Sequence, residues 1–395
     1  MPGYVFIGNS SKPSPEKNNS RAPVVPGNVS IPGIKAALRL GYTVYLGTNR
    51  NHPEELACEY PVKLFDAHTY RSITAFRDNK IAYRNLSEVV KKGDVEVIHC
   101  NTPVGGLIGR LVGKKLHVKK VIYTAHGFHF YKGAPLINRT VFKWAEKLMA
   151  HWTDALITMN EEDYQAAKRF RLKKGGKVYK VHGVGIDLSQ YTGAADPALR
   201  ASLGIAEEDI VLISAGDLVE RKNYSVALRA IAETGLKNLK YCICGTGPLM
   251  DRLRQEATDL GIEDQVLFLG FRSDVKALLK ISDLFLFTTK QEGLPRSMME
   301  AMASGLPCIV SRIRGNTDLI EEGKGGFLCD PADADGFAGA IRQLCGHPEL
   351  RRQMREYNLE KIRDYDVSVV EKEIMQIYTE VLGSAKEEKI PLPAN

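Results

Sequence analysis

The chain has 395 residues, of which 44% are hydrophobic and 26% charged, and its formal net charge is +7 at pH 7. No run approaches the ~18 consecutive apolar residues of a membrane-spanning helix, and the first fifteen residues do not resemble a secretory signal. A chain of this length exceeds one ordinary hydrophobic core, so we expect two domains of a soluble globular protein.

Short segments rich in apolar, β-branched and aromatic residues alternate with helical segments along the whole chain. Most of these short segments are continuously apolar, which is typical of strands buried on both faces. The predicted strands cover residues 4–8, 43–48, 95–100, 120–126, 155–160 and 177–183, and then 210–216, 240–245, 265–271, 284–289, 307–312 and 326–330. This alternation predicts an α/β protein with two doubly wound domains.

Three segments interrupt or end this pattern. Gly, Pro and small polar residues at 184–197 place the domain boundary, so we expect domains at 1–185 and 186–365. Residues 10–28 form an unusually long connection, typical of a lid or a disordered loop. The last predicted helix, 366–383, carries a row of apolar side chains on one side, which must be buried against another element. This apolar row comprises Val367, Val370, Ile374, Ile377, Tyr378 and Val381.

The stretch QEGLPRSMMEAMASG, residues 291–305, holds two glutamates eight positions apart. Pro295 suits the first position of a helix and Gly305 suits its end, so Glu292 precedes the helix and Glu300 lies roughly 7.5 Å along its axis. The free N–H groups of a first helical turn favour an anion such as a diphosphate. The two carboxylates would then bracket a nucleotide diphosphate that carries a polyhydroxylated group. The alternative is an amphipathic helix whose glutamates only face solvent.

The segment EGLPRSMMEA resembles the E-x7-E signature of the retaining glycosyltransferases of family 4. Further matching segments follow in the order of that family: AGDLVERKN, GTGPL, FLGFRSD, ISDLFLFTT, EAMASGLPCIVS, GNTDLI and GFLCDP. Upstream, YTAHGFHFYKGAP and HGVGID are similar to the branch that builds bacterial capsular and exopolysaccharide repeat units. The resemblance spans about residues 85–382. It implies a GT-B fold, with two Rossmann-like domains, a central cleft and a last helix that crosses back to the first domain.

The resemblance also implies roles for individual residues. Glu300 corresponds to the carboxylate that binds the nucleotide ribose, and Glu292 to the one that contacts the transferred sugar. Gly293 and Leu294 would offer backbone N–H groups to sugar and phosphate. Lys222 corresponds to the lysine that neutralises the diphosphate leaving group, although a lone lysine is more commonly a solvated surface group.

Five further residues belong to the expected donor site or lie close to it. His126 matches a first-domain histidine beside the anomeric carbon, although a lone histidine after a buried strand is more commonly structural. On the donor side the resemblance includes Pro295 and the glycines of GTGPL, Gly245 and Gly247. Arg272 could lie near the base or be an ordinary surface arginine.

The family usually has an arginine where this chain has Asp217. Arg221 or Arg296 could carry the missing positive charge, and both are kept as hypotheses. Arg296 and Asn316 are candidates for choosing the sugar. The Asp-x-Asp at Asp333 and Asp335 is expected to open a helix rather than to bind a metal.

The expected reaction is transfer of a hexosyl or N-acetylhexosaminyl unit from a nucleoside-diphosphate sugar to an acceptor hydroxyl, with retention at the anomeric carbon. Uridine is the base expected for this branch. The acceptor expected is a polyprenyl-diphosphate-linked saccharide, and neither a cofactor nor an essential metal is expected. Three alternatives stay open, namely a sugar-nucleotide epimerase of the same fold, a dinucleotide-dependent oxidoreductase, and a non-catalytic scaffold that binds glycan or lipid.

Charge is unevenly distributed, with 29 basic and 14 acidic residues (+15) in 1–185 and 25 basic and 33 acidic residues (−8) in 186–395. The basic half could face nucleic acid, anionic lipid or a phosphorylated acceptor, or be solvated surface. RNA-binding and zinc-finger signatures are absent, which argues against nucleic acid. We therefore expect peripheral binding at the inner face of the cytoplasmic membrane through the basic clusters 113–120 and 168–177. The seven cysteines, without a C-x-x-C, suit a reducing cytosol.

Overall fold

The computed structural model describes residues 1–8, 10 and 12–383, which form two compact units. The first unit contains Met1–Gly185 together with the chain from Ser368 onward, and the second contains Ile186–Val367. The helix α15 (Val367–Leu382) therefore starts at the end of the second unit and belongs almost entirely to the first. Along the described residues, no helix combines the length and the apolarity needed to cross a membrane.

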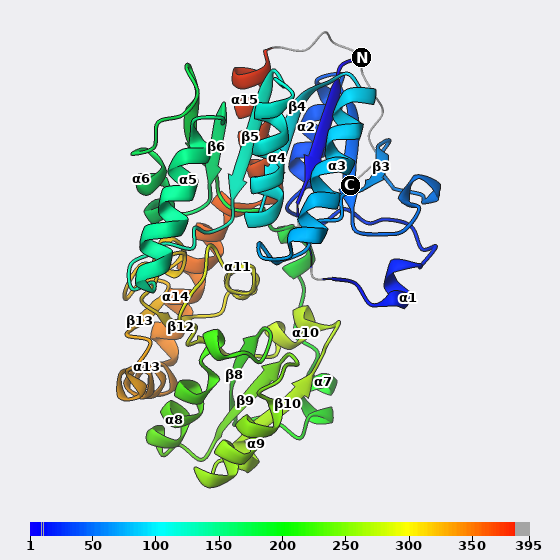
Figure 1. The fold of residues 1–395 in the computed structure, drawn as a ribbon. Coiled ribbons are helices and arrows are strands. Elements are labelled where there is room, and N and C mark those ends of the chain that lie inside the picture. The colour runs from blue at the N-terminus through cyan, green and yellow to red at the C-terminus, as the bar shows by residue number, and fades with distance from the viewer. Residues whose placement is uncertain (9, 11, 384–395) are drawn as a thin grey trace. The chain divides into compact units, whose positions relative to one another are not determined.

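The first unit contains a parallel sheet of seven strands in the order β3-β2-β1-β4-β5-β6-β7 (Figure 1). Its strands are β1 (Gly3–Ile7), β2 (Thr43–Thr48), β3 (Lys63–Asp66), β4 (Val95–Asn101), β5 (Lys120–Ala125), β6 (Ala155–Thr158) and β7 (Lys177–Lys180). Its helices are α1 (Pro15–Asn18), α2 (Ile31–Arg39), α3 (Phe76–Lys92), α4 (Pro103–Lys115), α5 (Lys143–Ala150) and α6 (Glu161–Ala167). The six predicted strands of this half are confirmed. The edge strand β3 was missed, because it is short and begins and ends on charged residues.

The long connection between β1 and α2 is partly structured. It contains α1, and two isolated parallel bridges join Ser10 to Tyr70 and Val24 to Cys58. The backbone N–H of Val24 also donates to the carbonyl of Ala57 at 2.8 Å. The described part of this connection is therefore held to the segment that flanks β3, rather than being a free loop.

Side chains of the first sheet alternate between two buried faces. Val5 and Ile7 of β1 pack into the core formed with α3 and α4, which lie in front of the sheet in Figure 1. Tyr4 of the same strand points to the opposite face, where its ring lies 6.0 Å from that of Tyr378 on α15. Since both faces are covered, every strand at the centre of this sheet must be apolar.

The helix α15 is fixed to the first unit by a buried polar cluster. The hydroxyl of Tyr378 lies 2.6 Å from the hydroxyl of Tyr4 and 2.6 Å from Nδ1 of His99. The other ring nitrogen of His99 lies 2.8 Å from Oγ1 of Thr124. Two ion pairs extend this attachment, Lys35 with Glu371 at 2.7 Å and His182 with Glu373 at 2.6 Å. The helix buries Val370, Ile374, Ile377 and Tyr378 of the predicted apolar row, and leaves Val367 and Val381 half-buried. The last helix thus belongs to the first domain, as the resemblance implied.

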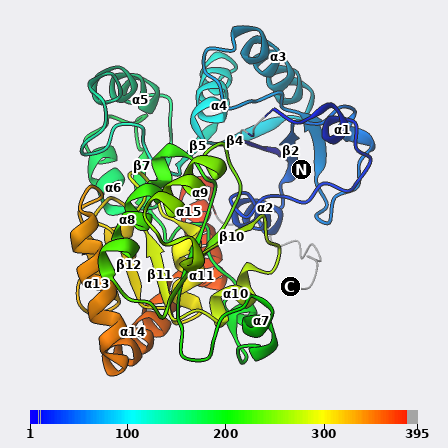
Figure 2. The ribbon, with the colours of Figure 1, turned by 90° about the horizontal axis from the view of Figure 1, so that it is seen from below.

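The second unit contains a parallel sheet of six strands in the order β10-β9-β8-β11-β12-β13. These are β8 (Ile210–Ala215), β9 (Leu239–Cys244), β10 (Val266–Gly270), β11 (Leu284–Phe287), β12 (Cys308–Ser311) and β13 (Gly326–Cys329), and all six were predicted. Its helices are α7 (Pro197–Ser202), α8 (Tyr224–Thr234), α9 (Met250–Asp259), α10 (Val275–Lys280), α11 (Arg296–Ala303), α12 (Asn316–Leu319), α13 (Ala334–Gly346) and α14 (Pro348–Lys361). Figure 2 shows α13 and α14 side by side.

The Asp-x-Asp of the second half opens a helix, as predicted. Asp333 is the N-cap of α13, and its side chain accepts a hydrogen bond of 2.9 Å from the backbone N–H of Gly336. Asp335 lies in the first turn of the helix, where a negative charge interacts favourably with the helix dipole. Both carboxylates therefore have a structural role.

The buried His99 predicts that acid destabilises the first unit. Burial, and then the charge of His126, lowers the pKa of His99 to about 3. The unfolded chain binds a proton at this residue below about pH 6.5. The folded unit does not, so the free energy of unfolding falls as the pH drops through this window. We expect the urea midpoint, followed by the fluorescence of Trp144 and Trp152, to be lower at about pH 5 than at about pH 7.5.

Substitution isolates the contribution of His99 from those of other acid-sensitive groups. The shift of the urea midpoint between the two pH values should be smaller in His99→Gln than in the parent chain. His52→Gln, at an exposed position of the same unit, should leave the shift unchanged. Equal shifts in the parent and His99→Gln would show that the imidazole does not contribute.

Candidate functional site

The candidate site lies where the strand order of the second sheet reverses. Strands β9 and β10 continue the sheet on one side of β8, and β11, β12 and β13 continue it on the other. The connections that leave β8 and β11 therefore diverge at the carboxyl end of the sheet, which is where open parallel sheets bind ligands. The connection after β8 carries Arg221 and Lys222, and the connection after β11 carries Glu292.

One carboxylate oxygen of Glu292 holds three neighbouring side chains. Its Oε1 lies 2.8 Å from Nζ of Lys222, 3.0 Å from Nη1 of Arg221 and 3.1 Å from Oγ1 of Thr289. The side chain of Lys222 is only 10% exposed, and its ammonium lies 4.7 Å from the ring centre of Phe287. Lys222 is thus not a solvated surface lysine. Two cations and one carboxylate leave this cluster with a net positive charge.

The backbone around Glu292 is supported by the connection after β12. A Cβ atom on Gly315, whose φ is +83°, would lie 2.3 Å from the carbonyl oxygen of Gly293. Nε of Arg314 donates to the carbonyl of Glu292 at 3.0 Å, while Leu294 packs against the apolar core. The segment from Glu292 to Leu294 is therefore held from behind by close backbone packing and an arginine.

Sequence reasoning missed two residues that contact Glu292. Thr289 is fully buried and follows the apolar strand β11, and a polar residue directly after a buried strand is a weak signal for a site at the sheet edge. Arg314 contacts Glu292 although the two residues are 22 positions apart in the sequence, and no local sequence pattern predicts that contact.

Helix α11 begins one residue later than predicted. Pro295 is its N-cap, with an extended ψ of 118°, and Arg296 is the first helical residue. The N-cap Pro295 makes no side-chain capping bond, and the N–H groups of a first helical turn have no partners within their own helix. Glu300 is the fifth residue of the helix, and its Oε1 lies 3.0 Å from Nε of Arg296. The two glutamates of the motif are thus each paired with an arginine.

Gly245 and Gly247 pack their loop against the connection that leads to Lys222. A Cβ atom on Gly245 would lie 1.9 Å from the carbonyl oxygen of Gly216, and one on Gly247 would lie 2.4 Å from that of Leu218. Neither position can carry a side chain without moving backbone. Their predicted place in the donor site stays a prediction, and the structure adds a packing reason for both glycines.

Two of the residues predicted to select base or sugar are held by the protein itself. Arg272 donates from Nε and Nη2 to the two carboxylate oxygens of Asp274, at 2.7 and 2.5 Å. Asn316 is fully buried at the start of α12, where Nδ2 donates to the carbonyl of Ser311 at 2.9 Å. Arg272 remains a candidate for the base, whereas the burial of Asn316 gives it a packing role and does not support a direct choice of sugar.

His126 belongs to the first unit, directly after β5. Its side chain is partly buried, and its Nε2 is shielded from solvent without a hydrogen-bond partner among the described residues. Burial lowers the pKa of His126 to about 4, so the imidazole is neutral near pH 7. A neutral imidazole can exchange hydrogen bonds with a sugar but cannot supply a positive charge.

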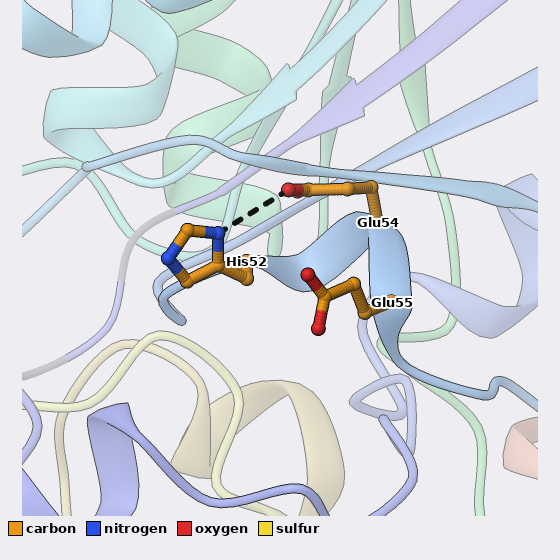
Figure 3. Close-up of side chains that lie close together, drawn as sticks. All are labelled: His52, Glu54 and Glu55. Carbon is orange, nitrogen blue, oxygen red and sulfur yellow. Dashed lines mark ion pairs between the residues drawn. The ribbon is translucent and has the colours of Figure 1, made fainter.

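One group of possible metal ligands occurs among the described residues, His52, Glu54 and Glu55 (Figure 3). All three are exposed in the first unit, and Nδ1 of His52 lies 3.6 Å from the carboxylate of Glu54. The carboxylate of Glu55 is engaged by Arg21. Exposed groups of this kind are common without a metal, so we assign no metal site to them.

Two parallel Rossmann-like units, with a candidate anion site at the switch point of the second, make this a protein of the GT-B fold class. The model of glycosyl transferases group 1 matches residues 196–361, and that of glycosyltransferase family 4 matches residues 34–190. EpsD of Bacillus subtilis (strain 168) is 33% identical over 318 residues, covering 79% of this chain and 83% of that protein. The chain belongs to the family 4 glycosyltransferases.

A further relative and two solved structures extend the comparison. The UDP-Gal:α-D-GlcNAc-diphosphoundecaprenol α-1,3-galactosyltransferase of Escherichia coli is 31% identical over 278 residues, covering 69% of this chain and 71% of that enzyme. HepE of Anabaena in complex with UDP-glucose has a TM-score of 0.75 at 18% identity, over 95% of this chain and 99% of that one. Sucrose-phosphate synthase of Thermosynechococcus elongatus has a TM-score of 0.77 at 18% identity, over 96% and 99%. At such identities the two structures show the fold alone.

The geometry discriminates between the two arginines that could replace the cation lost at Asp217. Arg221 shares a carboxylate oxygen with Lys222, whereas Arg296 pairs with Glu300 four residues further along its own helix. We expect Arg221→Ala to lower kcat/KM for sugar transfer by about 10- to 100-fold, the effect of one charged hydrogen-bond donor. We expect Arg296→Ala to lower it less. The reverse order in a steady-state assay would assign the role to Arg296.

Proposed function

We propose that the protein is a retaining glycosyltransferase of bacterial surface polysaccharide biosynthesis. It transfers a hexosyl or N-acetylhexosaminyl unit from a UDP-sugar to a hydroxyl of a polyprenyl-diphosphate-linked saccharide, at the inner face of the cytoplasmic membrane. The observation that carries the proposal is the convergence of Lys222 and Arg221 on Glu292 directly before the amide-rich start of α11.

This charge arrangement supports a sugar nucleotide as the donor. A sugar nucleotide presents two phosphates, and the cluster offers two cations close to a helix start whose dipole favours anions. Glu300, the fifth residue of that helix, would accept hydrogen bonds from the ribose hydroxyls. The relative from Escherichia coli is named as using UDP-galactose, and HepE is seen with UDP-glucose. These names support uridine, and the first also supports a polyprenyl-linked acceptor.

The chemical difficulty of the reaction is the charge that develops on the departing diphosphate. Lys222, Arg221 and the N–H groups of Gly293 and Leu294 would stabilise that charge, a preorganised arrangement typically worth several kcal/mol. In this proposal the bond from the anomeric carbon to phosphate breaks and the bond to the acceptor oxygen forms on the same side of the sugar. The acceptor proton passes to the departing phosphate oxygen. Lys222, Arg221 and the helix start would together offset the charge on the diphosphate, so the proposal includes no essential metal.

Two groups would contact the transferred sugar. Glu292 lies in the loop before α11, where its free carboxylate oxygen can accept hydrogen bonds from sugar hydroxyls while Oε1 holds the cations. His126 would approach from the first unit as a neutral hydrogen-bonding group beside the anomeric carbon.

Removal of the Glu300 carboxylate tests the donor assignment. We expect Glu300→Gln to raise the Kd for UDP about 10- to 100-fold, because charged hydrogen bonds to the ribose are lost. Titration calorimetry measures this directly, with Glu208→Gln as a control at an exposed position of the same unit. Unchanged UDP affinity in Glu300→Gln would remove Glu300 from the donor site.

The overall reaction is tested by incubating the purified protein with UDP-sugars and a polyprenyl-diphosphate-linked saccharide. We expect one donor to be consumed only in the presence of acceptor, with the anomeric configuration of the donor retained in the product by proton NMR. Chelation of divalent metals should leave the rate within about twofold, because Lys222 and Arg221 carry the compensating charge. Release of an epimerised UDP-sugar without acceptor would establish the epimerase alternative instead.

A further inference from the structure

An apolar patch lies on the surface of the first unit, on the helical segment 136–150. Five of the eleven exposed large hydrophobic residues in the described chain fall within thirteen positions of this segment. They are Leu136, Ile137, Val141, Trp144 and Leu148, and we call them the apolar stripe. Single exposed apolar residues are normal on soluble proteins, but a contiguous group that includes a tryptophan marks an interaction surface.

The helical geometry places these side chains on one side. The segment begins with a π-helical turn (Asn138–Phe142) and continues as α5. At about 100° per residue, Val141, Trp144 and Leu148 lie within roughly 60° of one another around the helix axis. Trp144 is 67% exposed. These three side chains therefore form one solvent-exposed side of the helix.

The opposite side of the same helix packs into the protein. The ring of Phe142 stacks on that of His129 with centroids 5.4 Å apart, and Met149 is buried. The carboxylate of Glu146 pairs with Arg110 of α4, with 2.7 Å between Oε2 and Nη1. Because this side is already occupied by α4 and the core, the stripe faces away from the described residues of its own unit.

The charges around the stripe are mostly positive. The helical segment 136–150 carries Arg139, Lys143 and Lys147, and its one acidic residue, Glu146, faces the interior. Beside the stripe is a hollow of ≈ 550 Å³ whose lining includes Lys132, Arg139, Lys143, Arg169 and one acid, Glu162. The carboxylate of Glu162 accepts a hydrogen bond of 2.7 Å from the backbone N–H of Lys132. The hollow is thus basic and adjoins apolar surface.

We propose that the apolar stripe docks the first unit on a bilayer containing anionic lipids. In this arrangement Val141, Trp144 and Leu148 enter the boundary between headgroups and acyl chains, and the flanking cations lie at the level of the lipid phosphates. An apolar face with an aromatic anchor and flanking basic residues is the composition that binds membrane interfaces. The hollow beside the stripe holds one such phosphate.

Charge argues against a second copy of this chain as the occupant. Residues 1–185 have a net charge of +15, so two identical stripes would bring two basic surfaces together and repel. An anionic bilayer is complementary both to the apolar face and to the charge around it. The inference does not depend on which sugar nucleotide the second unit binds.

The structure also revises the expected membrane surface. The predicted clusters 113–120 and 168–177 are partly neutralised, because Lys119 pairs with Glu96, and Lys120 and Lys173 pair with Asp154. The ammonium of Lys114 lies 4.1 Å from the ring centre of Trp152. Arg169 lines the hollow beside the stripe. We therefore assign the membrane contact to α5, with the two clusters as its margins.

Tryptophan fluorescence tests insertion directly. The chain has two tryptophans, so Trp152→Phe leaves Trp144 as the single reporter in the full-length protein. With vesicles of phosphatidylcholine and phosphatidylglycerol, we expect a blue shift of its emission and quenching by lipids brominated along the acyl chains. Vesicles of phosphatidylcholine alone should bind more weakly. Absence of quenching with bound protein would show contact with headgroups only and overturn the insertion.

A matched pair of double variants tests the stripe itself. We expect Val141→Ser with Leu148→Ser to weaken sedimentation with anionic vesicles at least about tenfold, since ~1.4 kcal/mol of apolar transfer is one decade. Ile73→Ser with Phe76→Ser removes two exposed apolar side chains elsewhere on the same unit and should bind as the parent does. Both pairs lie at the surface, so thermal melts should remain unchanged.

Two outcomes would assign the stripe to another occupant. Equal vesicle binding by the two double variants would show that the stripe does not bind the membrane. A dimer in gel filtration that the stripe variant converts to a monomer, without change in vesicle binding, would identify a second copy. Neither assay includes a sugar nucleotide, so loss of UDP binding with vesicle binding intact would defeat the proposed function and leave this inference standing.

Discussion

The Oε1 atom of Glu292 organises the candidate site, because it holds Lys222 at 2.8 Å and Arg221 at 3.0 Å in one place. Two long basic side chains would otherwise repel each other and spread into solvent. The carboxylate neutralises one of the two charges, so the cluster keeps a positive excess. Lys222 and Glu292 are mostly buried, which strengthens their electrostatic effect because charges interact more strongly away from bulk water, whereas Arg221 is about half exposed. The contacts of Thr289 and Arg314 serve to hold this carboxylate and its backbone in position.

The parallel sheet explains how residues 70 positions apart reach the same point. All strands of the second unit end at one edge, and the reversal of strand order between β8 and β11 leaves the two connections without a neighbour between them. The connection after β8 can pass close to the loop after β9 only because Gly245 and Gly247 have no side chain. Local backbone packing thus sets the position of Lys222 before any ligand binds.

Patterns that depend on neighbours in sequence were predicted well, and those that depend on tertiary packing were not. Twelve strands were predictable because strands buried on both faces are continuously apolar, whereas β3 is a short edge strand with charged ends. The start of α11 was predicted one residue too early, at Pro295, because a proline suits both the N-cap and the first turn of a helix. Asn316 was a candidate for choosing the sugar, and only the fold shows that it is buried. Thr289 and Arg314 meet Glu292 through space, which no periodicity encodes.

The orientation of α5 follows from a buried charge and not from its apolar residues. The segment 136–150 has apolar side chains on two sides, so periodicity alone does not decide which side faces the core. Arg110 is completely buried, with its guanidinium 3.8 Å from the ring centre of Tyr123, and a buried cation without a partner is strongly destabilising. Its partner Glu146 must therefore point inward, which turns Trp144 and its neighbours outward. Polar residues at the outward positions would leave the ion pair of Arg110 and Glu146 intact, so the ion pair does not explain why these positions are apolar. A contact with an apolar medium explains it.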